Sequence, residues 1–324
     1  MRTFKMICVI LCCLAVLAGC GTPAAQPGET EATQMEETTQ QTTDLNGKKF
    51  VFIGDSFTFT GRAVLQNTAL SERERRYDTG YFYQICKANG DEVTVSNWTV
   101  GGKSLEALLT GYLPMYSDYN YDYVVISSGR NSSTTYEYLS GVLDRYIELF
   151  RKANPDVKFV FLVTSGAHNI SIKESFPIDW LNNLDKIEEK GFIVVDWGKL
   201  VADLARGEVS VPGGTLEYNN YSFVHHKSET DGFHPNQLAG YITALMTYCA
   251  ITGESAQGQT YDFWCDASLS DQFNPQGYYK YAYTRGDSNY QDVFASSEEM
   301  AGIQKLIDQY LADKAFRNYN FTRE

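Results

Sequence analysis

Five short segments rich in Val, Ile and Phe recur between residues 50 and 195, and polar residues bound each of them. The first, Phe50-Val51-Phe52-Ile53, is a continuous apolar run between Lys49 and Gly54, a pattern typical of a strand buried on both faces. The same reasoning predicts four more strands, one marked by Val93 and Val95 and ending near Asn97, and the others at 123–126, 159–163 and 192–195.

Apolar residues repeat with a helical period in the segments between and after these strands. Strands that alternate with helices predict a parallel sheet covered on both sides, and right-handed crossovers make it an α/β, doubly wound, flavodoxin-like fold with three α/β/α layers. The residues that share helix faces are Leu139, Leu143, Ile147 and Phe150; Ile178, Leu181, Leu184 and Ile187; Leu238, Ile242, Leu245 and Cys249; and Met300, Ile303, Ile307 and Leu311.

The first twenty residues have the pattern of a targeting segment. Arg2 and Lys5 precede a short apolar run, residues 6–17, that is too short for a comfortable membrane span. The run ends in Leu17-Ala18-Gly19-Cys20, which resembles the lipobox of bacterial lipoproteins. The resemblance implies cleavage before Cys20 and lipidation of Cys20. An uncleaved apolar helix, or an ordinary signal peptide with a chance Cys, is the alternative.

Composition divides the rest of the chain. Residues 21–47 are rich in Thr, Glu and Gln, and such a segment cannot bury enough apolar surface to fold. We therefore predict a signal peptide at 1–19, a lipidated Cys and disordered tether at 20–47, and a folded domain at 48–252. An aromatic-rich extension at 253–324 is expected to pack on that domain, although its Tyr and Trp side chains also suit sugar stacking. The expected location is outside the cytoplasm, anchored by lipid to the bacterial cell membrane.

The charge of the chain argues against nucleic acid and anionic lipid as binding partners. The chain has 40 acidic and 27 basic residues, a formal net charge of −13. Nucleic-acid binding depends on Lys and Arg that neutralise phosphates, so no nucleic-acid partner is predicted. A basic patch for anionic lipid is also missing from the sequence, so the membrane contact is expected through the N-terminal lipid only.

The Cys and His residues do not form a metal-binding pattern. Cys86, Cys249 and Cys265 remain after the signal and anchor cysteines, and they lack a C-x-x-C spacing. The four His form no H-x-x-x-H pattern. No metal and no cofactor is predicted. One disulfide among the three cysteines is possible, and the sequence leaves open whether any pair forms it.

Polar residues follow three of the predicted strands, at 54–57, 100–104 and 128–131, where ligands bind in doubly wound folds. A fourth polar segment, 231–236, is expected to open a helix. Ser56 becomes a nucleophile only with a base beside it, and His234 is the natural base, with Asp231 on the same turn to orient it. The backbone N–H groups of Ser56 and Gly102 and the amide of Asn131 could stabilise an oxyanion. Asp55 is expected to accept a hydrogen bond within its turn rather than to catalyse.

These segments resemble the motifs of SGNH (GDSL-like) hydrolases: GDSF at 54–57, G-x-N at 129–131 and DxxHPN at 231–236. The resemblance covers residues 48–252. It implies Ser56 as nucleophile, His234 as base, Asp231 as the partner of His234, and an oxyanion hole of Ser56, Gly102 and Asn131. Two features depart from the family pattern. Ser132 stands where many members have Asp, and Gly101 is a rival to Gly102. Gly102-Lys103-Ser104 is similar to the Gly-Arg-Ser of carbohydrate acetylesterases, which favours Gly102.

The expected function is that of an exported serine esterase that hydrolyses acyl esters, and the expected esters are O-acetyl groups on carbohydrate. The substrate would be a small-molecule or glycan ester. Two alternatives stay open: an O-acyltransferase that uses the same site, and a non-catalytic carbohydrate-binding lipoprotein. Neither the acyl group nor the glycan follows from the sequence.

Overall fold

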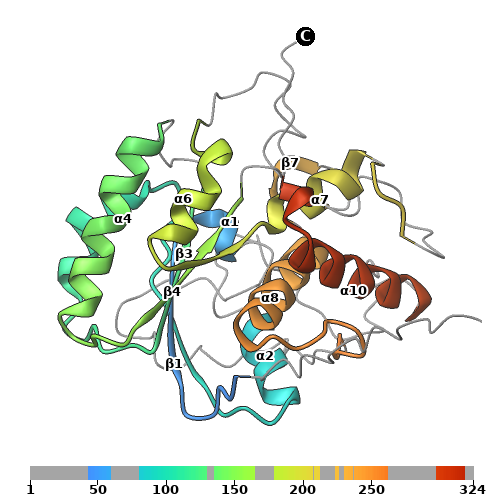
Figure 1. Ribbon diagram of the computed structural model, residues 1–324, viewed down its shortest axis with the longest axis horizontal. Coiled ribbons are helices and arrows are strands. Elements are labelled where there is room, and N and C mark those ends of the chain that lie inside the picture. The colour runs from blue at the N-terminus through green and yellow to red at the C-terminus, as the bar shows by residue number, and fades with distance from the viewer. Residues whose placement is uncertain are drawn as a thin grey trace, which may run out of the picture. The chain divides into compact units, whose positions relative to one another are not determined.

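The structure is a computed structural model that describes residues 43–59, 80–129, 135–164, 179–206, 208–211, 223–225, 230–235, 237–261 and 297–317. All of them belong to one compact unit of the chain, residues 40–324. Its centre is a parallel sheet of five strands in the order β2-β1-β3-β4-β5 (Figure 1). The strands are β1 (Lys49–Ile53), β2 (Thr94–Asn97), β3 (Tyr123–Ser127), β4 (Lys158–Leu162) and β5 (Phe192–Val195).

This order confirms the predicted doubly wound, flavodoxin-like sheet. The chain crosses from β1 to β2 on one side and then returns past β1 to β3 on the other, so the strand order reverses at β1. In open parallel sheets, ligands bind beyond the carboxyl ends of the strands at such a reversal. We call the turns that follow β1, β2 and β3 the carboxyl edge of the sheet, and a ligand is expected to bind there.

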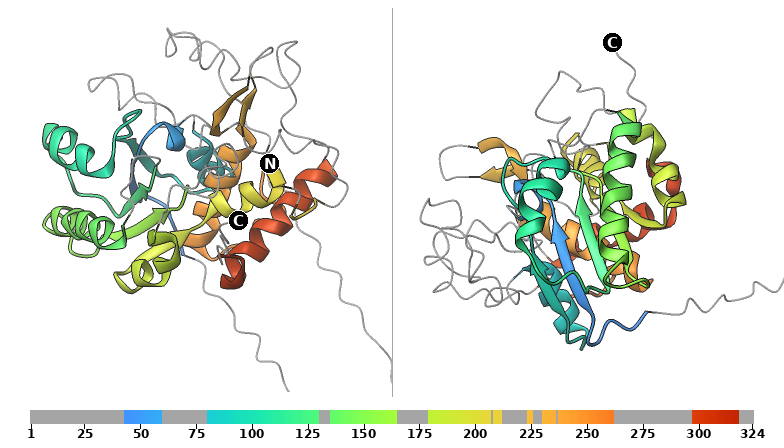
Figure 2. Two further views of the ribbon diagram at one scale, coloured as in Figure 1. Left: turned by 90° about the horizontal axis from the view of Figure 1, so that it is seen from above. Right: turned by 90° about the vertical axis from the view of Figure 1, so that its left-hand side faces the viewer.

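Both faces of the sheet are covered by helices (Figure 1), and Figure 2 shows the same layers from above. Successive residues of a strand point to opposite faces, so Phe50 and Phe52 belong to one core and Val51 and Ile53 to the other. All four side chains are completely buried. The first core includes α2 (Tyr81–Ala88), α7 (Trp197–Arg206), α8 (Gln237–Thr252) and α10 (Ser297–Ala312), and the second includes α3 (Leu105–Ala107), η2 (Leu108–Tyr112), η3 (Leu113–Met115), α4 (Tyr136–Arg151), η4 (Asp179–Asn183) and α6 (Leu184–Glu189).

Three of the predicted helices, α4, α8 and α10, are present, and their expected apolar faces are buried except for Ile147 and Leu311, which are partly buried. The fourth differs: Ile178 lies outside the described residues, and the rest of the pattern forms a 3-10 turn, η4, followed by the short helix α6. Asn183, the last residue of η4, has φ −126° and ψ 26°, values outside those of a regular helix, so the helix cannot run through it. Among the described residues, no helix is both long and apolar enough to cross a membrane.

The segment 231–236 does not open a helix as the sequence analysis predicted. Residues Thr230–Pro235 form strand β7, which pairs antiparallel with β6 (Phe223–His225), and α8 starts only at Gln237. Pairing with β6, at Phe223–Pro235 and His225–Thr230, accompanies the extended backbone of this segment.

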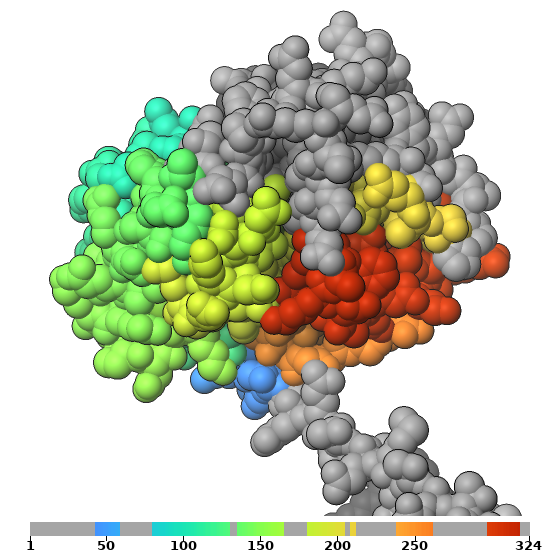
Figure 3. All heavy atoms as spheres, turned by 45° about the horizontal axis from the view of Figure 1, so that its top comes forward, coloured from blue at the N-terminus to red at the C-terminus, as the bar shows by residue number. Residues whose placement is uncertain are grey.

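The C-terminal segment, residues 297–317, consists of α10 and the turn η6 (Lys314–Arg317). It packs against α7 and α8 and lies beside the region of α6 in the space-filling view (Figure 3, red). Buried Asp203 on α7 accepts hydrogen bonds from Lys199 Nζ at 2.6 Å and from Tyr310 Oη on α10 at 2.5 Å. Arg317 donates from Nη2 to the carbonyl oxygen of Val194 at 3.2 Å. Arg317 thereby satisfies a backbone group on β5, an edge strand of the sheet.

Candidate active site

The turn after β1 carries Ser56, the first residue of α1 (Ser56–Phe59). Its conformation is fixed by Asp55, whose Oδ1 accepts a hydrogen bond from the backbone N–H of Phe57 at 3.0 Å. The carbonyl oxygen of Asp55 accepts a second one from Thr58 N at 3.0 Å. Asp55 is thus a hydrogen-bond acceptor in its turn, as predicted. Ser56 is partly buried, whereas Asp55 is 2% exposed.

Residue 54 in this turn has to be glycine, because there is no space for a Cβ atom. A Cβ at Gly54 would lie 2.4 Å from Thr58 Oγ1 and 2.8 Å from Ser127 Cβ, both closer than real atoms approach. Thr58 and Ser127 are buried, and neither side chain can move out toward solvent. The glycine of the GDSF motif therefore lets α1 pack directly against β3.

The turn after β2 contains Gly102 and adjoins the Ser56 turn. Val100 N donates to the carbonyl oxygen of Gly54 at 2.9 Å, which continues the β1–β2 pairing beyond the strands. Lys103 N closes the turn on the Val100 carbonyl oxygen at 3.3 Å. Gly102, and not its rival Gly101, has a positive φ, +70°, a conformation that favours glycine. Gly102 is exposed, and a Cβ there would meet nothing within 4 Å.

The turn after β3 contains Gly129, and it approaches the Ser56 turn more closely than the Gly102 turn does. Gly129 has φ +56°, and a Cβ on it would lie 2.6 Å from Asp55 Oδ2. Ser128 Oγ and Thr164 Oγ1 are 2.9 Å apart, and Thr164 N donates to Ser128 Oγ at 3.1 Å, so the ends of β3 and β4 are joined. Asn131, the predicted oxyanion donor in the same loop, lies outside the described residues, as does the predicted lipid anchor Cys20.

Asp231 and His234 lie on β7, and β7 contacts α1. The segments that carry the three predicted triad residues are therefore neighbours. The prediction that Asp231 and His234 share one helical turn is wrong, because the backbone there is extended. Positions three apart in a regular strand lie on opposite faces. The pairing of β6 with β7 is irregular, however. Phe223 is opposite Pro235 and His225 is opposite Thr230, so an advance of two positions along β6 corresponds to five positions along β7.

The sequence analysis did not single out Tyr112, which accompanies the Gly102 turn. The Lys103 Nζ lies 5.8 Å from the centroid of the Tyr112 ring, a cation–π geometry. Tyr112 ends η2, a π-helical segment, and irregular helices of this kind occur often at functional sites. Helix type is set by packing, so no local sequence signal could have identified this pair.

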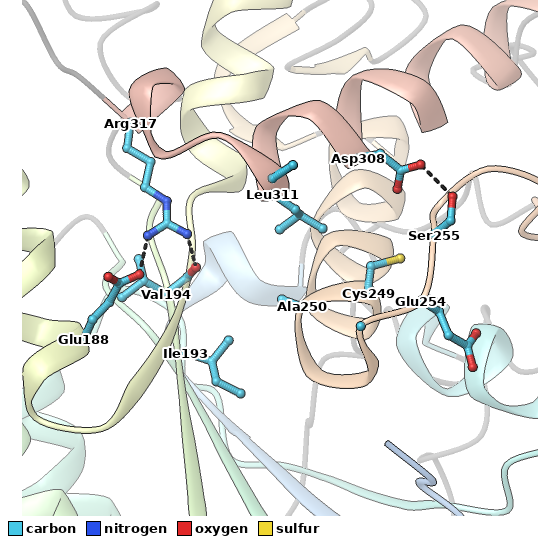
Figure 4. Close-up of a pocket in the computed structure, with 12 residues that line it drawn as sticks. Glu188, Ile193, Val194, Cys249, Ala250, Glu254, Ser255, Asp308, Leu311 and Arg317 are labelled. Atoms are coloured by element: carbon cyan, nitrogen blue, oxygen red, sulfur yellow. Dashed lines mark hydrogen bonds and ion pairs between the residues drawn. The ribbon is translucent and has the colours of Figure 1, made fainter. Parts of the chain in front are cut away.

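A separate pocket of about 490 Å³ lies between β5, the end of α8 and the C-terminal segment (Figure 4). Arg317 faces Glu188 and the Val194 carbonyl on one side, Asp308 faces Ser255 on the other, and Leu311 lies between them (Figure 4). Each charged side chain of the pocket has a partner. Arg317 pairs with Glu188, Asp308 accepts from Ala256 N, and Glu254 accepts a hydrogen bond from Tyr248 Oη at 2.9 Å. The pocket lining includes no residue of the three turns.

The buried thiols do not add a reactive group. Cys86 and Cys249 are both free and buried, so they are not disulfide-bonded to each other, and Cys265 lies outside the described residues. Burial raises the pKa of both thiols far above the ordinary range, so they stay protonated at neutral pH. Within the described part of the chain, no group of three or more His, Cys, Asp or Glu is placed to hold a metal ion.

No model of a protein family matches this chain, and no curated protein matches it. Solved structures do resemble it. A candidate GDSL-like lipase from Parabacteroides merdae is 17% identical, with a TM-score of 0.44 over 66% of this chain and 99% of its own. A carbohydrate esterase family 2 enzyme from Corynascus thermopiles (Myceliophthora fergusii) is also 17% identical, with a TM-score of 0.40 over 65% of this chain and 67% of its own.

An acetylxylan esterase from Geobacillus stearothermophilus is 18% identical to the chain, with a TM-score of 0.42 over 63% of this chain and 94% of its own. These proteins are GDSL-like lipases and esterases, and what this chain has in common with them is a parallel sheet flanked by helices. Their activities are properties of those proteins.

Proposed function

We propose that this chain is an exported serine esterase that hydrolyses acyl esters with Ser56 as nucleophile, His234 as base and Asp231 as the partner of His234. The contact between α1, which begins with Ser56, and β7, which contains Asp231 and His234, is the observation that supports it most. The position of the Ser56 turn at the carboxyl end of β1, where the strand order reverses, is the place at which this fold class binds ligands.

In the first half of the proposed reaction, Ser56 Oγ attacks the ester carbonyl carbon while His234 accepts the hydroxyl proton. The carbonyl oxygen becomes an oxyanion, which the N–H groups of Ser56 and Gly102 and the amide of Asn131 would stabilise. The intermediate then collapses, the bond to the alcohol oxygen breaks, and the protonated His234 gives its proton to that oxygen.

In the second half, a water molecule attacks the acyl-Ser56 carbonyl and gives a proton to His234. The second intermediate collapses, the bond to Ser56 Oγ breaks, and His234 returns the proton to Ser56. The acid leaves, and the enzyme is restored with no net change in protons on the protein. A negative Asp231 would favour the positively charged His234 that forms in both halves.

The substrate class in this proposal is an O-acetylated carbohydrate. The likeness of Gly102-Lys103-Ser104 to the acetylesterase motif supports it, as does the aromatic content of 14%. Tyr112 beside the Gly102 turn is an aromatic side chain of the described part that could contact a sugar ring there.

A serine-directed fluorophosphonate tests the reaction class, and a panel of acetylated glycans tests the substrate. We expect one phosphonyl group on the peptide that contains Ser56 and release of acetate from at least one glycan. Transfer of acetyl to an added sugar, with little free acetate, would make the protein an acyltransferase. Glycan binding with neither labelling nor turnover would contradict the proposal and favour a binding protein.

We also propose that the protein is a lipoprotein attached to the bacterial cell membrane through Cys20. The apolar run that ends at Leu17-Ala18-Gly19-Cys20 supports this. The wild-type protein is expected to partition into detergent and to carry a mass increment of lipid size, whereas Cys20→Ser should do neither. Cys86→Ser, which changes a buried thiol, is the matched control and should partition like wild type. Equal partitioning of Cys20→Ser and wild type would refute the anchor.

A further inference from the structure

We propose that Asp55 is a positioning residue that couples the Ser56 turn to the loop after β3. It would do so through two atoms of one carboxylate: Oδ1 holds the turn of α1, and Oδ2 lies against Gly129. The inference rests on the proposed function, since it assigns Asp55 the task of holding Ser56 and the Gly129 loop in one fixed relation.

The first half of the coupling is the hydrogen bond from Phe57 N to Asp55 Oδ1 at 3.0 Å. Phe57 directly follows Ser56, and Thr58 N also bonds to the Asp55 carbonyl. Asp55 therefore fixes the backbone of the two residues that follow Ser56. A side chain that accepts hydrogen bonds from the first turn of a helix in this way stabilises that turn.

The second half is the contact with Gly129. The three nearest atoms to a Cβ built on Gly129 are all in the Asp55 carboxyl group, at 2.6, 2.8 and 3.0 Å. The backbone of the β3 loop thus passes directly over the carboxylate, which is 2% exposed. Any residue other than glycine at 129 would push against the group that holds Ser56.

The geometry has a consequence for catalysis. Gly129 is two residues before Asn131, the proposed oxyanion donor, in the sequence, and Gly129 itself lies against the residue that fixes the Ser56 turn. A displacement of about 1 Å between such groups can lower a rate by about 10²-fold. Asp55 is expected to act on the rate of the chemical step without touching the substrate.

A double-mutant cycle on thermal stability tests the coupling without any assumption about activity. Gly129→Ala should lose stability both from the positive φ and from the clash of its Cβ with the Asp55 carboxylate. Gly47→Ala, with φ +74° and nothing within 4 Å, should lose stability from the backbone conformation alone. We expect Gly47→Ala to lower Tm by about 2–4 °C and Gly129→Ala to lower it at least twice as much. In an Asp55→Ala background, Gly129→Ala should cost no more than Gly47→Ala does. An equal cost of Gly129→Ala in both backgrounds would overturn the coupling.

Kinetics test the positioning role. Asp55→Ala is expected to lower kcat, per folded molecule, and the rate of fluorophosphonate labelling of Ser56 by about 10- to 100-fold, with KM changed less than about threefold. Asp55→Asn keeps an oxygen acceptor for Phe57 N and should recover most of both rates. Unchanged rates in Asp55→Ala, or Asp55→Asn as slow as Asp55→Ala, would overturn the role. If Ser56 of wild type does not react at all, the proposed function fails, while the stability cycle still decides the coupling.

Discussion

The carboxyl edge of the sheet and the C-terminal segment 297–317 are attached to the same core in different ways. The turns of the edge are joined by main-chain hydrogen bonds, such as Val100 N to Gly54 O, and by the approach of Gly129 to Asp55. The C-terminal segment buries the apolar face of α10 in the core. Charged groups add a second attachment: Glu188 pairs with Lys314 and Arg317, and Asp203 accepts from Tyr310.

The difference has a physical consequence. Main-chain hydrogen bonds and steric contacts do not titrate between pH 3 and pH 9, and salt hardly screens them. Ion pairs are screened by salt and lost when the carboxylate is protonated. The main-chain hydrogen bonds between the turns should therefore persist over a wide range of pH and salt, whereas the ion pairs of the C-terminal segment should weaken in acid. Substitutions at the edge should change activity, with a loss of stability as well at Gly129, whereas substitutions in the C-terminal segment should change stability alone.

Ser56→Ala should have the largest effect on activity. Removal of the nucleophile leaves only substrate binding and oxyanion stabilisation, so kcat/KM should fall by about 10⁴-fold or more. Tm should stay within about 2 °C of wild type, because Asp55 still holds the turn. Turnover and thermal unfolding of the same preparation measure both. Turnover within about threefold of wild type would eliminate Ser56 as the nucleophile.

Asn131→Ala should lower kcat by about 10²- to 10³-fold, the cost of losing one oxyanion donor. KM should change little, since the donor acts mainly on charge that develops in the transition state. Steady-state kinetics and the fluorophosphonate labelling rate should fall together. A raised KM with normal kcat would mean that Asn131 binds the ground state instead.

Asp231→Asn is the contrasting change at the same site. It leaves the oxyanion donors in place and disturbs the tautomer of His234, so its effect on kcat should be larger at neutral than at high pH. A pH profile of kcat for both variants separates the two roles. Parallel profiles would mean that Asp231 does not act through His234.

Arg317→Met should lower stability and leave activity unchanged. It breaks the pair with Glu188 and leaves the Val194 carbonyl without its donor, at a cost of about 1–2 kcal/mol, or a few °C in Tm. Arg145→Met is the matched control, because the Arg145–Glu106 pair is more exposed, at 48% and 33%, and should matter less. Equal losses of stability in the two variants would contradict a special role for Arg317.

The smallest expected effect is the pH dependence of the stability difference between wild type and Arg317→Met. Burial raises the pKa of Glu188, but hydrogen bonds from Lys314 and Arg317 outweigh it and lower the pKa below its usual value. The stabilisation is thus complete above the unfolded pKa, about 4.3, and is lost as the pH falls through the lower folded value. Tm should therefore drop more between pH 6 and pH 3.5 in wild type than in Arg317→Met. The same drop in both would show that this pair does not contribute.

The sequence predicted the strands well because their burial is a local property of composition. The run at 50–53 and the run at 159–163 are apolar at every position, and each is a strand with both faces covered. The position of Ser56 after the first of them follows from the same pattern. The interruption at Asn183 and the β6–β7 pair did not follow, because neither leaves a periodic apolar signature.

The sequence by itself determined the doubly wound sheet, the segments at its carboxyl edge and the chemical types of side chain present there. Only the tertiary structure decided that Asp231 and His234 lie on a strand that contacts α1, and that Gly129 lies against Asp55. Asp55 and Gly129 are 74 positions apart, and the pairing of β7 depends on residues 223–225. A contact of this kind is fixed by which strands become neighbours in the sheet, and a local pattern of residues contains no information about its distant partner.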